Sequence, residues 1–154
     1  VMLGAGFFLL HPTLNLSFDL VGTLLVLAAF FVLAALHELV HGIVWSACAK
    51  GGWKAVSFGV IWQYLTPYCT CDEPLSKRAY VVGALAPTAV LGLLPVIAAY
   101  ASGSAGLLAV GLLMILGGGG DFAIVLKMLR FKPDGREVRF LDHPYECGLV
   151  AFVR

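Results

Sequence analysis

The stretch from Leu20 to Lys50, LVGTLLVLAAFFVLAALHELVHGIVWSACAK, decides the fold of this chain. From Leu20 to Leu36 it is almost entirely apolar, and the apolar character continues past His-Glu-Leu-Val-His at residues 37–41. An α-helix needs about 20 such residues to cross the hydrocarbon core of a bilayer. The stretch is therefore expected to form one membrane-crossing helix, over about residues 20–50, that holds ionisable side chains in its interior.

The composition of the whole chain agrees with a membrane protein. Of its 154 residues, 60% are hydrophobic and 12% are charged, whereas about 25% of the residues of a soluble domain are charged. This argues against a soluble globule, and the high apolar content excludes intrinsic disorder. The net charge of +1 is not the cationic surplus that binds nucleic acid. The length suits one membrane-embedded domain, residues 1–154, with three to four crossings.

Two further helices are expected in the second half of the chain. The run from Ala79 to Gly120 contains no charged side chain, and a small polar stretch at residues 102–106 divides it. We expect helices over about 79–101 and 105–130, joined by a tight turn. The opening run, residues 1–10, is too short to cross a bilayer and stops at His11-Pro12. We interpret it as the end of a partial helix that begins upstream, or as an interfacial segment.

Short strands are expected between and after the helices. Residues 53–71 alternate loosely between β-branched or aromatic residues and smaller ones, which predicts a β-hairpin at the cytoplasmic membrane surface. Residues 131–154 are more polar, and a turn sequence at 133–135 precedes two expected strands near 137–141 and 149–153. The predicted fold is an α-helical integral membrane protein with three to four transmembrane helices, a small cytoplasmic β-hairpin and a short cytoplasmic tail.

The basic residues predict an orientation in the membrane. All ten Lys and Arg residues fall into two blocks, one over residues 50–78 and one over residues 127–154. Two predicted crossings separate the blocks, so both should lie on the same side of the membrane. Because cytoplasmic loops carry an excess of Lys and Arg, we expect both blocks, and with them the C-terminal tail, to lie in the cytoplasm.

Four ionisable residues lie well inside the apolar runs: His37, Glu38, His41 and Asp121. Such side chains are costly in hydrocarbon and normally serve a function there. His37 and His41 share one helix face and can bind one zinc ion, with Glu38 beside its open position. Zinc acidifies a bound water, and Glu38 can accept the proton as the water attacks a peptide carbonyl. The alternative is a pair of structural histidines that hydrogen-bond to their helix neighbours.

A catalytic zinc site usually has three protein ligands, and Asp121 is the candidate for the third. His37 and Asp121 lie at nearly equal distances along the chain from the outer ends of their expected helices, Leu20 and Ala105. At ~1.5 Å per residue, both are about 25 Å from the outer surface. We expect Gly117–Gly120 to let this backbone approach the zinc helix closely. His143, in the polar tail, is the runner-up third ligand if the tail folds back over the site.

These residues resemble the site-2 protease class of intramembrane zinc metalloproteases and, in its neighbourhood, a family of small membrane proteins described as "putative zincin peptidases". The resemblance covers most of the chain. It rests on residues 37–41, on residues 68–80 with Glu73-Pro74-Leu75-Ser76, on Leu85-Ala86-Pro87 and on Gly120-Asp121. It implies that His37, His41 and Asp121 hold zinc and that Glu38 is the general base. Site-2 proteases commonly show Asn-Pro ahead of a ligand-bearing Asp-Gly, whereas here Phe122 follows Asp121 and no Asn-Pro is present.

The pattern favours a zinc-dependent endopeptidase that acts on membrane-tethered proteins, within the lipid bilayer or at its surface. The alternative is a non-enzymatic membrane protein that binds metal or serves as a scaffold. Glu38 favours the enzyme, because a purely structural metal site needs no carboxylate beside an open position. The uncharged run over residues 79–120 argues against a transporter, which needs polar ligands along a path through the membrane.

The expected hairpin has two interpretations. A membrane helix must unwind before its peptide carbonyls become accessible, and a strand edge can hydrogen-bond the unwound segment. The hairpin could therefore pair with substrate through residues 56–64, or it could only cover the helix ends. Cys69 and Cys71, in the same segment, are expected to be structural rather than metal ligands.

Overall fold

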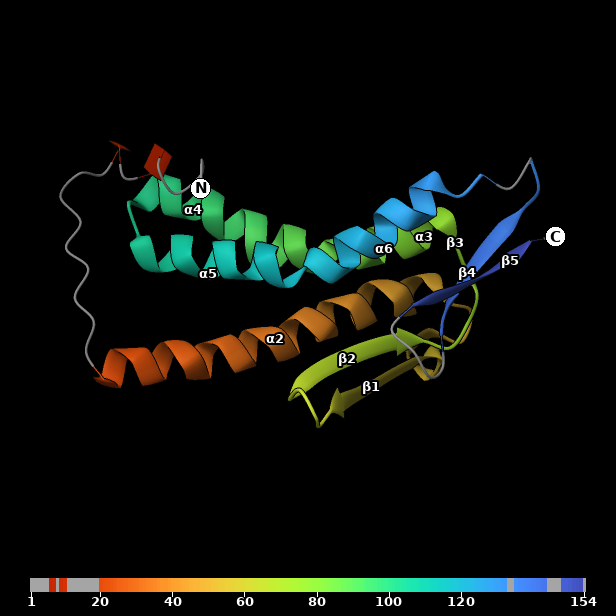
Figure 1. The fold of residues 1–154 in the computed structure, drawn as a ribbon, viewed down its shortest axis with the longest axis horizontal. Coiled ribbons are helices and arrows are strands. Elements are labelled where there is room, and N and C mark those ends of the chain that lie inside the picture. Colours follow the sequence, from red (N-terminus) through yellow and green to blue (C-terminus); the bar gives the residue numbers. More distant parts are fainter. Residues whose placement is uncertain (1–5, 8, 11–19, 133–134, 144–147, 154) are drawn as a thin grey trace.

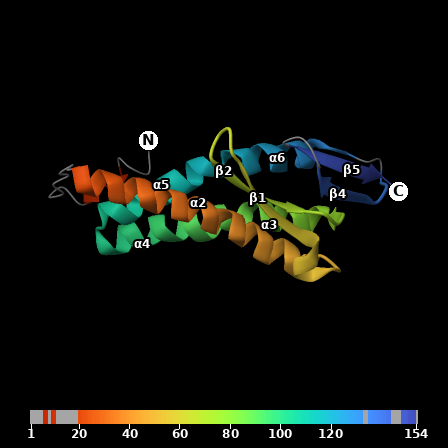
Figure 2. The same cartoon turned by 90° about the horizontal axis from the view of Figure 1, so that it is seen from below.

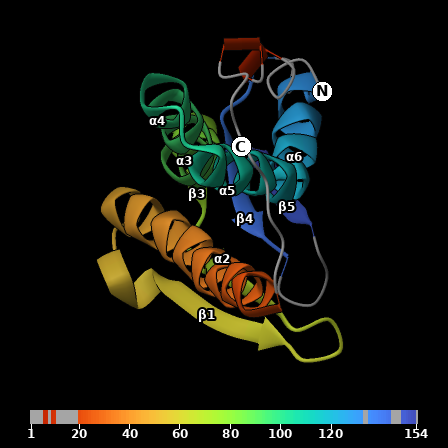
Figure 3. The same cartoon turned by 90° about the vertical axis from the view of Figure 1, so that its left-hand side faces the viewer.

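A computed structural model describes residues 6–7, 9–10, 20–132, 135–143 and 148–153. One long helix, α2, lies between a layer of shorter helices and a β-hairpin (Figure 1). The view along the molecule shows the same order, with the hairpin on one side of α2 and the other helices on the opposite side (Figure 3). A second small sheet lies at the end of the molecule that holds the C-terminus (Figure 2).

Helix α2 extends over Leu20–Cys48, which confirms the long helix predicted from the apolar run. It ends just before the pair Gly51-Gly52, where Gly52 has a φ of +58°. Glycine adopts this left-handed conformation without strain. The short 3-10 helix η1, Gly52–Ala55, then turns the chain into the first strand.

The second predicted helix is helical over residues 77–102 but has three parts. These are α3 (Lys77–Pro87), the π-helical turn η2 (Thr88–Leu93) and α4 (Leu94–Ser102). The Ser76 hydroxyl caps α3 by accepting a hydrogen bond from the Ala79 N–H, 3.3 Å away. The π-helical turn lies between Pro87 and Pro95, and proline interrupts the α-helical hydrogen-bond ladder because it has no N–H. Gly103, with a φ of +71°, ends α4.

The third predicted helix is two helices, α5 (Ala105–Gly117) and α6 (Gly119–Arg130), which meet at an angle of 44°. The Ser104 hydroxyl accepts a hydrogen bond from the Leu107 N–H at the start of α5, which confirms the tight turn predicted at 102–106. The prediction of one continuous helix over 105–130 was wrong. The break at Gly118 has a packing reason, because a Cβ there would lie 2.1 Å from the Thr88 Oγ1.

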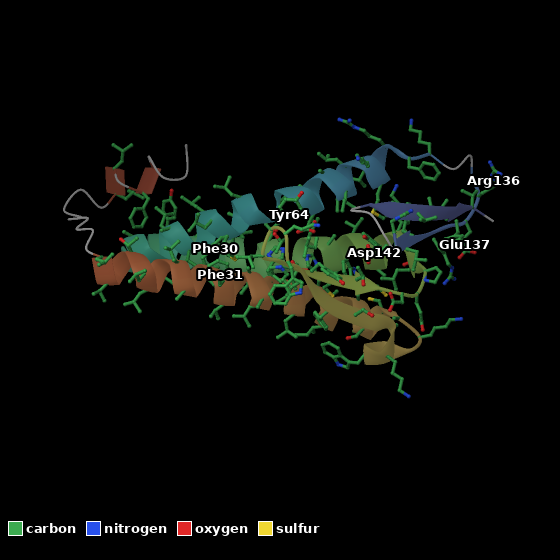
Figure 4. All side chains as sticks on the ribbon, turned by 60° about the horizontal axis from the view of Figure 1, so that its bottom comes forward. Phe30, Phe31, Tyr64, Arg136, Glu137 and Asp142 are labelled. Carbon is green, nitrogen blue, oxygen red and sulfur yellow. The ribbon has the colours of Figure 1, made fainter. Side chains whose placement is uncertain are left out.

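Strands β1 (Val56–Ile61) and β2 (Thr66–Cys71) form the predicted hairpin. They are antiparallel, with Val56 opposite Cys71 and Ile61 opposite Thr66. The hairpin does not lie beyond the end of α2, where we had expected it at the membrane surface. It runs back along the helix, so that Tyr64 in its turn lines the same cavity as Phe30 and Phe31 of α2 (Figure 4).

Packing explains why the hairpin folds back. Cys69 and Cys71 of β2 belong to the same buried cluster as Trp45 of α2 and Tyr80 of α3. The strand therefore continues the core of the helix layer, and its direction is fixed by the helix against which it packs. The sequence alternation predicted the strands but contained no information about this partner.

The C-terminal tail adds a three-stranded antiparallel sheet. It consists of β3 (Leu75–Ser76), β4 (Val138–Asp142) and β5 (Leu149–Val153), in the order β3-β4-β5. The two strands expected near 137–141 and 149–153 are thus confirmed, whereas the turn expected at 133–135 lies mostly outside the described residues. Phe140 of β4 is buried with Tyr80 and Met128, which joins the tail to the helix layer.

Among the residues described, two helical segments are long and apolar enough to cross a membrane, Thr23–Cys48 and Lys77–Ser102. The bent pair α5 and α6 makes a third if it counts as one span. Of the opening run 1–10, Gly6, Phe7, Leu9 and Leu10 are helical, and its other residues and His11 are outside the described ranges. Phe7 is buried with Val96 and Leu108.

Candidate metal centre

His37 and His41 lie one turn apart on the buried face of α2, with ring centroids 4.9 Å apart. Asp121, in the first turn of α6, meets both rings. Its Oδ2 lies 3.1 Å from the His37 Nε2, and its Oδ1 lies 3.5 Å from the His41 Nε2. The structure therefore brings together the three residues that the sequence proposed as metal ligands.

These distances suit a zinc ion. Two atoms that each lie about 2.1 Å from a tetrahedral zinc are about 3.4 Å apart, close to the separations between the imidazole nitrogens and the carboxylate oxygens. The ligand atoms of His37, Glu38 and His41 also lie within 4.8 Å of one another. The donor set, two imidazoles and a carboxylate, is of the kind found in catalytic zinc sites. His37, His41 and Asp121 are the residues that would hold the ion.

The hydrogen bond made by the His41 Nδ1 fixes the direction of the other ring nitrogen, Nε2. The His41 Nδ1 lies 2.9 Å from the carbonyl oxygen of Gly83 in α3 and donates a hydrogen bond to it. An imidazole that donates through Nδ1 presents the lone pair of Nε2, and such a partner on the far nitrogen is usual for zinc-ligating histidines. The Gly83 carbonyl thus orients His41 toward Asp121.

Trp45 completes the face of α2 that carries the histidines. Its indole stacks on the His41 ring, with centroids 4.9 Å apart and planes at 15°, and its Nε1–H donates to the Tyr80 carbonyl oxygen, 3.4 Å away. Gly83 leaves room for it, because a Cβ there would lie 2.0 Å from the Trp45 Nε1. Sequence reasoning missed both residues. The spacing 37, 41, 45 could have revealed Trp45, but a backbone carbonyl has no signal in the sequence.

Glu38 faces the hairpin. Its carboxylate is within hydrogen-bonding reach of the Cys69 backbone N–H, and the next alternate residue, Cys71, donates its N–H to the Asp142 carboxylate, 2.8 Å away. In an antiparallel pair, alternate residues point their backbone groups away from the partner strand. Pro67, which has no N–H to donate, fits the same outward set. The outer edge of β2 therefore lies toward the site, and β1 (Val56–Ile61) is paired to the opposite edge of β2.

A cavity of about 460 Å³ opens beside these residues. Two carboxylates and one imidazole face it, from Glu38, Asp121 and His37, and the rest of its wall is mostly apolar. The hairpin turn covers one side of it, opposite the aromatic side chains of Phe30 and Phe31 (Figure 4). A largely apolar cavity with a few convergent polar groups is the usual form of a ligand or active site.

His143, the runner-up third ligand, directly follows β4. Its backbone N–H donates to the Gly148 carbonyl oxygen, 2.9 Å away, at the end of the β4–β5 pair. The tail reaches the vicinity of the site through the preceding residue. Asp142 accepts hydrogen bonds from the Tyr80 hydroxyl and from the Cys71 N–H, and burial raises the pKa of its carboxyl above the usual range.

Gly117–Gly120 do not approach α2 as closely as we expected. Only Gly118 is tightly packed, and its neighbour is Thr88 of η2 rather than α2. A Cβ added at Gly117, Gly119 or Gly120 would meet no atom within 4 Å. The space beside three of the four glycines is open, so close helix packing explains only one of them.

A family model described as "Putative zincin peptidase" matches residues 30–135. The match covers more than half of the chain and includes His37, Glu38, His41 and Asp121. No curated protein and no solved structure matches the chain.

Proposed function

The chain belongs to the family described as "Putative zincin peptidase", and we propose that it is a zinc-dependent endopeptidase that hydrolyses peptide bonds of membrane-tethered proteins. The observation that carries the proposal is the meeting of His37 and His41 with Asp121, with Glu38 beside them on a cavity. When bound there, zinc would supply Lewis-acid chemistry that activates water and polarises a peptide carbonyl.

The residues of the chain supply the proton transfer and the geometry. Glu38 is the general base, which takes a proton from the attacking water and returns it to the leaving amine. The Cys69 N–H, within reach of the Glu38 carboxylate, holds the base in place. The hydrogen bond from the His41 Nδ1 to the Gly83 carbonyl keeps the opposite nitrogen directed at the site.

The β2 edge supports a substrate in extended form. A transmembrane helix satisfies its own backbone hydrogen bonds and must unwind locally before a peptide carbonyl can be attacked. The outward carbonyl group of Pro67, which lines the cavity, can accept a hydrogen bond from the unwound segment, as in strand addition. We therefore assign the substrate contact to β2 rather than to residues 56–64.

The positions of the basic residues support a cytoplasmic location for this end of the molecule. The end of α2, the start of α3 and the end of α6 lie together at the end that carries the C-terminal sheet (Figure 1). Both Lys- and Arg-rich blocks belong to these segments and to the tail. With cytoplasmic loops enriched in Lys and Arg, the β3-β4-β5 sheet would face the cytoplasm.

Substitution of Glu38 by glutamine tests the mechanism. The amide cannot accept the proton from water, and general base catalysis contributes about 10²–10⁴-fold in rate. We expect E38Q to retain about one zinc per chain, measured by elemental analysis, because a catalytic zinc site needs only its three protein ligands to hold the ion. It should cleave a designed single-span membrane protein with a Gly-Pro interruption at least about 100-fold more slowly than the unchanged chain.

The same preparations distinguish the alternatives. Loss of zinc in D121A, with undiminished zinc in H143A, would support the proposed third ligand, whereas full zinc in D121A with loss in H143A would transfer the third ligand to the tail. Equal cleavage by the unchanged chain and by E38Q would exclude the mechanism. Zinc bound without any cleavage by either protein would favour a non-enzymatic metal-binding or scaffold protein.

A further inference from the structure

The cavity beside Glu38 has one wall that the catalytic residues do not explain. Its apolar lining comes from the first half of α2 and from the junction of α5 and α6, and it includes Phe30, Phe31, Ala34, Met114, Gly117 and Gly120. Its volume of about 460 Å³ is within the range of about 300–1,000 Å³ typical of ligand sites. The cavity is therefore large enough for more than a water molecule and the reacting peptide bond.

Neither backbone conformation nor packing requires glycine at the two positions in this wall. Gly117 and Gly120 do not have the positive φ that disfavours other residues. A Cβ at either position would meet no atom within 4 Å. Both glycines lie at the junction of α5 and α6, and their lack of a side chain keeps space free beside the cavity.

We propose that this wall forms a subsite for one large apolar side chain, of the size of leucine or phenylalanine, on the substrate segment beside the bond to be hydrolysed. Gly117 and Gly120 are its specificity-determining positions. The inference rests on the proposed function, because the subsite takes its substrate from the same cavity.

The subsite lies next to the β2 edge, and this position favours a peptide over a lipid chain as its occupant. Thr66 and Pro67 of β2 line the cavity together with Glu38 and Asp121. A segment paired with the β2 edge would direct alternate side chains to opposite faces, so that one of them enters the apolar wall. An acyl chain has no groups to pair with the edge or with the two carboxylates.

Shape, rather than transfer from water, sets the selectivity of such a subsite. Lipid tails are as apolar as a leucine side chain, so entry from the bilayer gains little from the hydrophobic effect. The gain comes from contacts that fill the cavity, and a smaller side chain leaves those contacts unmade. A residue larger than glycine in the wall would therefore exclude large side chains and tolerate small ones.

Binding, measured without hydrolysis, tests the subsite. The zinc-loaded E38Q protein in nanodiscs is titrated with three single-span peptides that carry a Gly-Pro interruption and differ only by Ala, Leu or Phe at the next position. We expect the Leu and Phe peptides to bind more tightly than the Ala peptide. Adding G117V or G120V should lower the affinity for the Phe peptide at least about tenfold, the lower end for a misfit in an apolar pocket. The affinity for the Ala peptide should stay unchanged.

Gly119 provides the matched control. It lies in the same run, a Cβ there would also meet no atom within 4 Å, and it does not line the cavity. G119V should keep the order and the affinities of the three peptides. Zinc content, measured on every variant, separates filling of the subsite from displacement of Asp121.

Two results would overturn the subsite. One is equal affinity of the three peptides for the E38Q protein. If G117V then displaced spin-labelled lipid and not peptide, the occupant would be an acyl chain. The other is the same loss of affinity in G119V as in G120V. The proposed function is tested separately by the cleavage assay. The order of peptide affinities, and its dependence on Gly117 and Gly120, can be measured without any hydrolysis.

Discussion

At the scale of single residues, the two thiols of β2 show what burial does to reactivity. Cys69 and Cys71 are 8% and 1% exposed, and burial raises the pKa of both thiols, to about 12 for Cys69. Carboxylates nearby, among them Glu38 and Asp142, add to the shift of Cys69. Because the thiolate is the nucleophile and the metal ligand, these thiols suit packing, as the sequence suggested.

The raised pKa of Cys69 predicts its reactivity and a dependence of stability on pH. At pH 8, iodoacetamide should alkylate the exposed Cys48 at least about 100-fold faster than Cys69, as measured for each residue by mass spectrometry. An unfolded thiol loses its proton near pH 9, whereas folded Cys69 holds it to about 12. Its contribution to the free energy of unfolding is therefore complete below pH 9 and falls as the pH rises toward 12. Equal alkylation rates of Cys48 and Cys69 in the folded protein would contradict the raised pKa of Cys69.

The meeting of His37, His41 and Asp121 at the candidate metal centre was predictable, because it involves side chains that the sequence names. The spacing of His37 and His41 placed two imidazoles on one face of a helix, and the depth count led to Asp121. The carbonyl of Gly83 and the N–H of Cys69 were not predictable, because every residue has such groups and only the packing of α3 and β2 selects these two. Trp45 lay in the same i, i+4 series as the histidines and was missed.

At the scale of elements, the contact between α2 and α3 depends on Gly83. A Cβ there would lie 2.0 Å from the Trp45 Nε1, so in G83A either the indole or the helix must move. We expect a loss of about 1–3 kcal/mol in the free energy of unfolding, typical of overpacking. Since the Gly83 carbonyl would move away from the His41 Nδ1, zinc affinity should also fall about 10–100-fold. Denaturant titration and a competitive zinc chelator measure the two effects.

The matched control for this contact is Gly106 in α5. A Cβ there would come no closer than 3.9 Å to its nearest neighbour, the Ser104 Oγ. G106A should leave zinc affinity unchanged and stabilise the helix by up to about 1 kcal/mol. If G83A were as stable and bound zinc as tightly as G106A, close packing of α3 on Trp45 would not orient His41.

Asp142 joins three elements, because its carboxylate accepts hydrogen bonds from Tyr80 of α3 and from Cys71 of β2 while lying in β4. D142A would leave both donors without this acceptor, which costs about 1–3 kcal/mol for each buried donor. D142N keeps an oxygen for the Cys71 N–H. Burial raises the Asp142 pKa, so the negative charge itself is unfavourable there, and D142N should be markedly more stable than D142A in denaturant titration.

Asp72, which accepts a hydrogen bond from the Ser57 hydroxyl at the exposed end of the hairpin, is the control for Asp142. Exposed positions of this kind change stability by about 0.5 kcal/mol or less, so D72N should resemble the unchanged chain. An equally large loss in D142N and D142A would mean that the charge, and not the acceptor geometry, holds the three elements together.

Helix boundaries followed from local sequence more closely than helix shape did. The apolar run predicted α2, and the Ser-Gly turn predicted the end of α4 and the start of α5. The bend between α5 and α6 was not predicted, because it depends on contact between Gly118 and Thr88, which are distant in the sequence. Likewise, alternation predicted the hairpin but not the direction in which it packs along α2.

At the scale of the whole molecule, the exposed surface fits the presence of two or three helical segments long and apolar enough to cross a membrane. Large apolar side chains are exposed along the outer faces of α2, α4 and α6, among them Leu25, Ile97 and Leu126. Soluble monomers rarely expose contiguous apolar patches above a few hundred Å², whereas a bilayer covers such faces at no cost. The basic residues gather toward the end of the molecule that carries the C-terminal sheet, which fits an interface with water.

The exposed aromatic residues of the hairpin extend this reasoning to the membrane depth of the whole assembly. Trp62 is 78% exposed, and its neighbour Tyr64 lines the cavity beside Phe30 and Phe31. These two phenylalanines lie near the middle of α2, well inside both of its ends at Leu20 and Cys48. If α2 crosses the bilayer, the hairpin turn lies at the same depth and Trp62 contacts acyl chains.

Fluorescence quenching by brominated lipids measures that contact. Bromine in the middle of the acyl chain quenches a tryptophan that it touches, so W62F should remove most of the quenching observed for the unchanged chain. Trp53, 54% exposed just after the end of α2 and beside Lys54, belongs at the level of the headgroups, where tryptophan is enriched. W53F should therefore remove much less of the quenching. If W62F left the quenching unchanged while W53F abolished it, the hairpin would lie at the membrane surface, and substrate would meet His37, His41 and Asp121 from the water phase rather than within the bilayer.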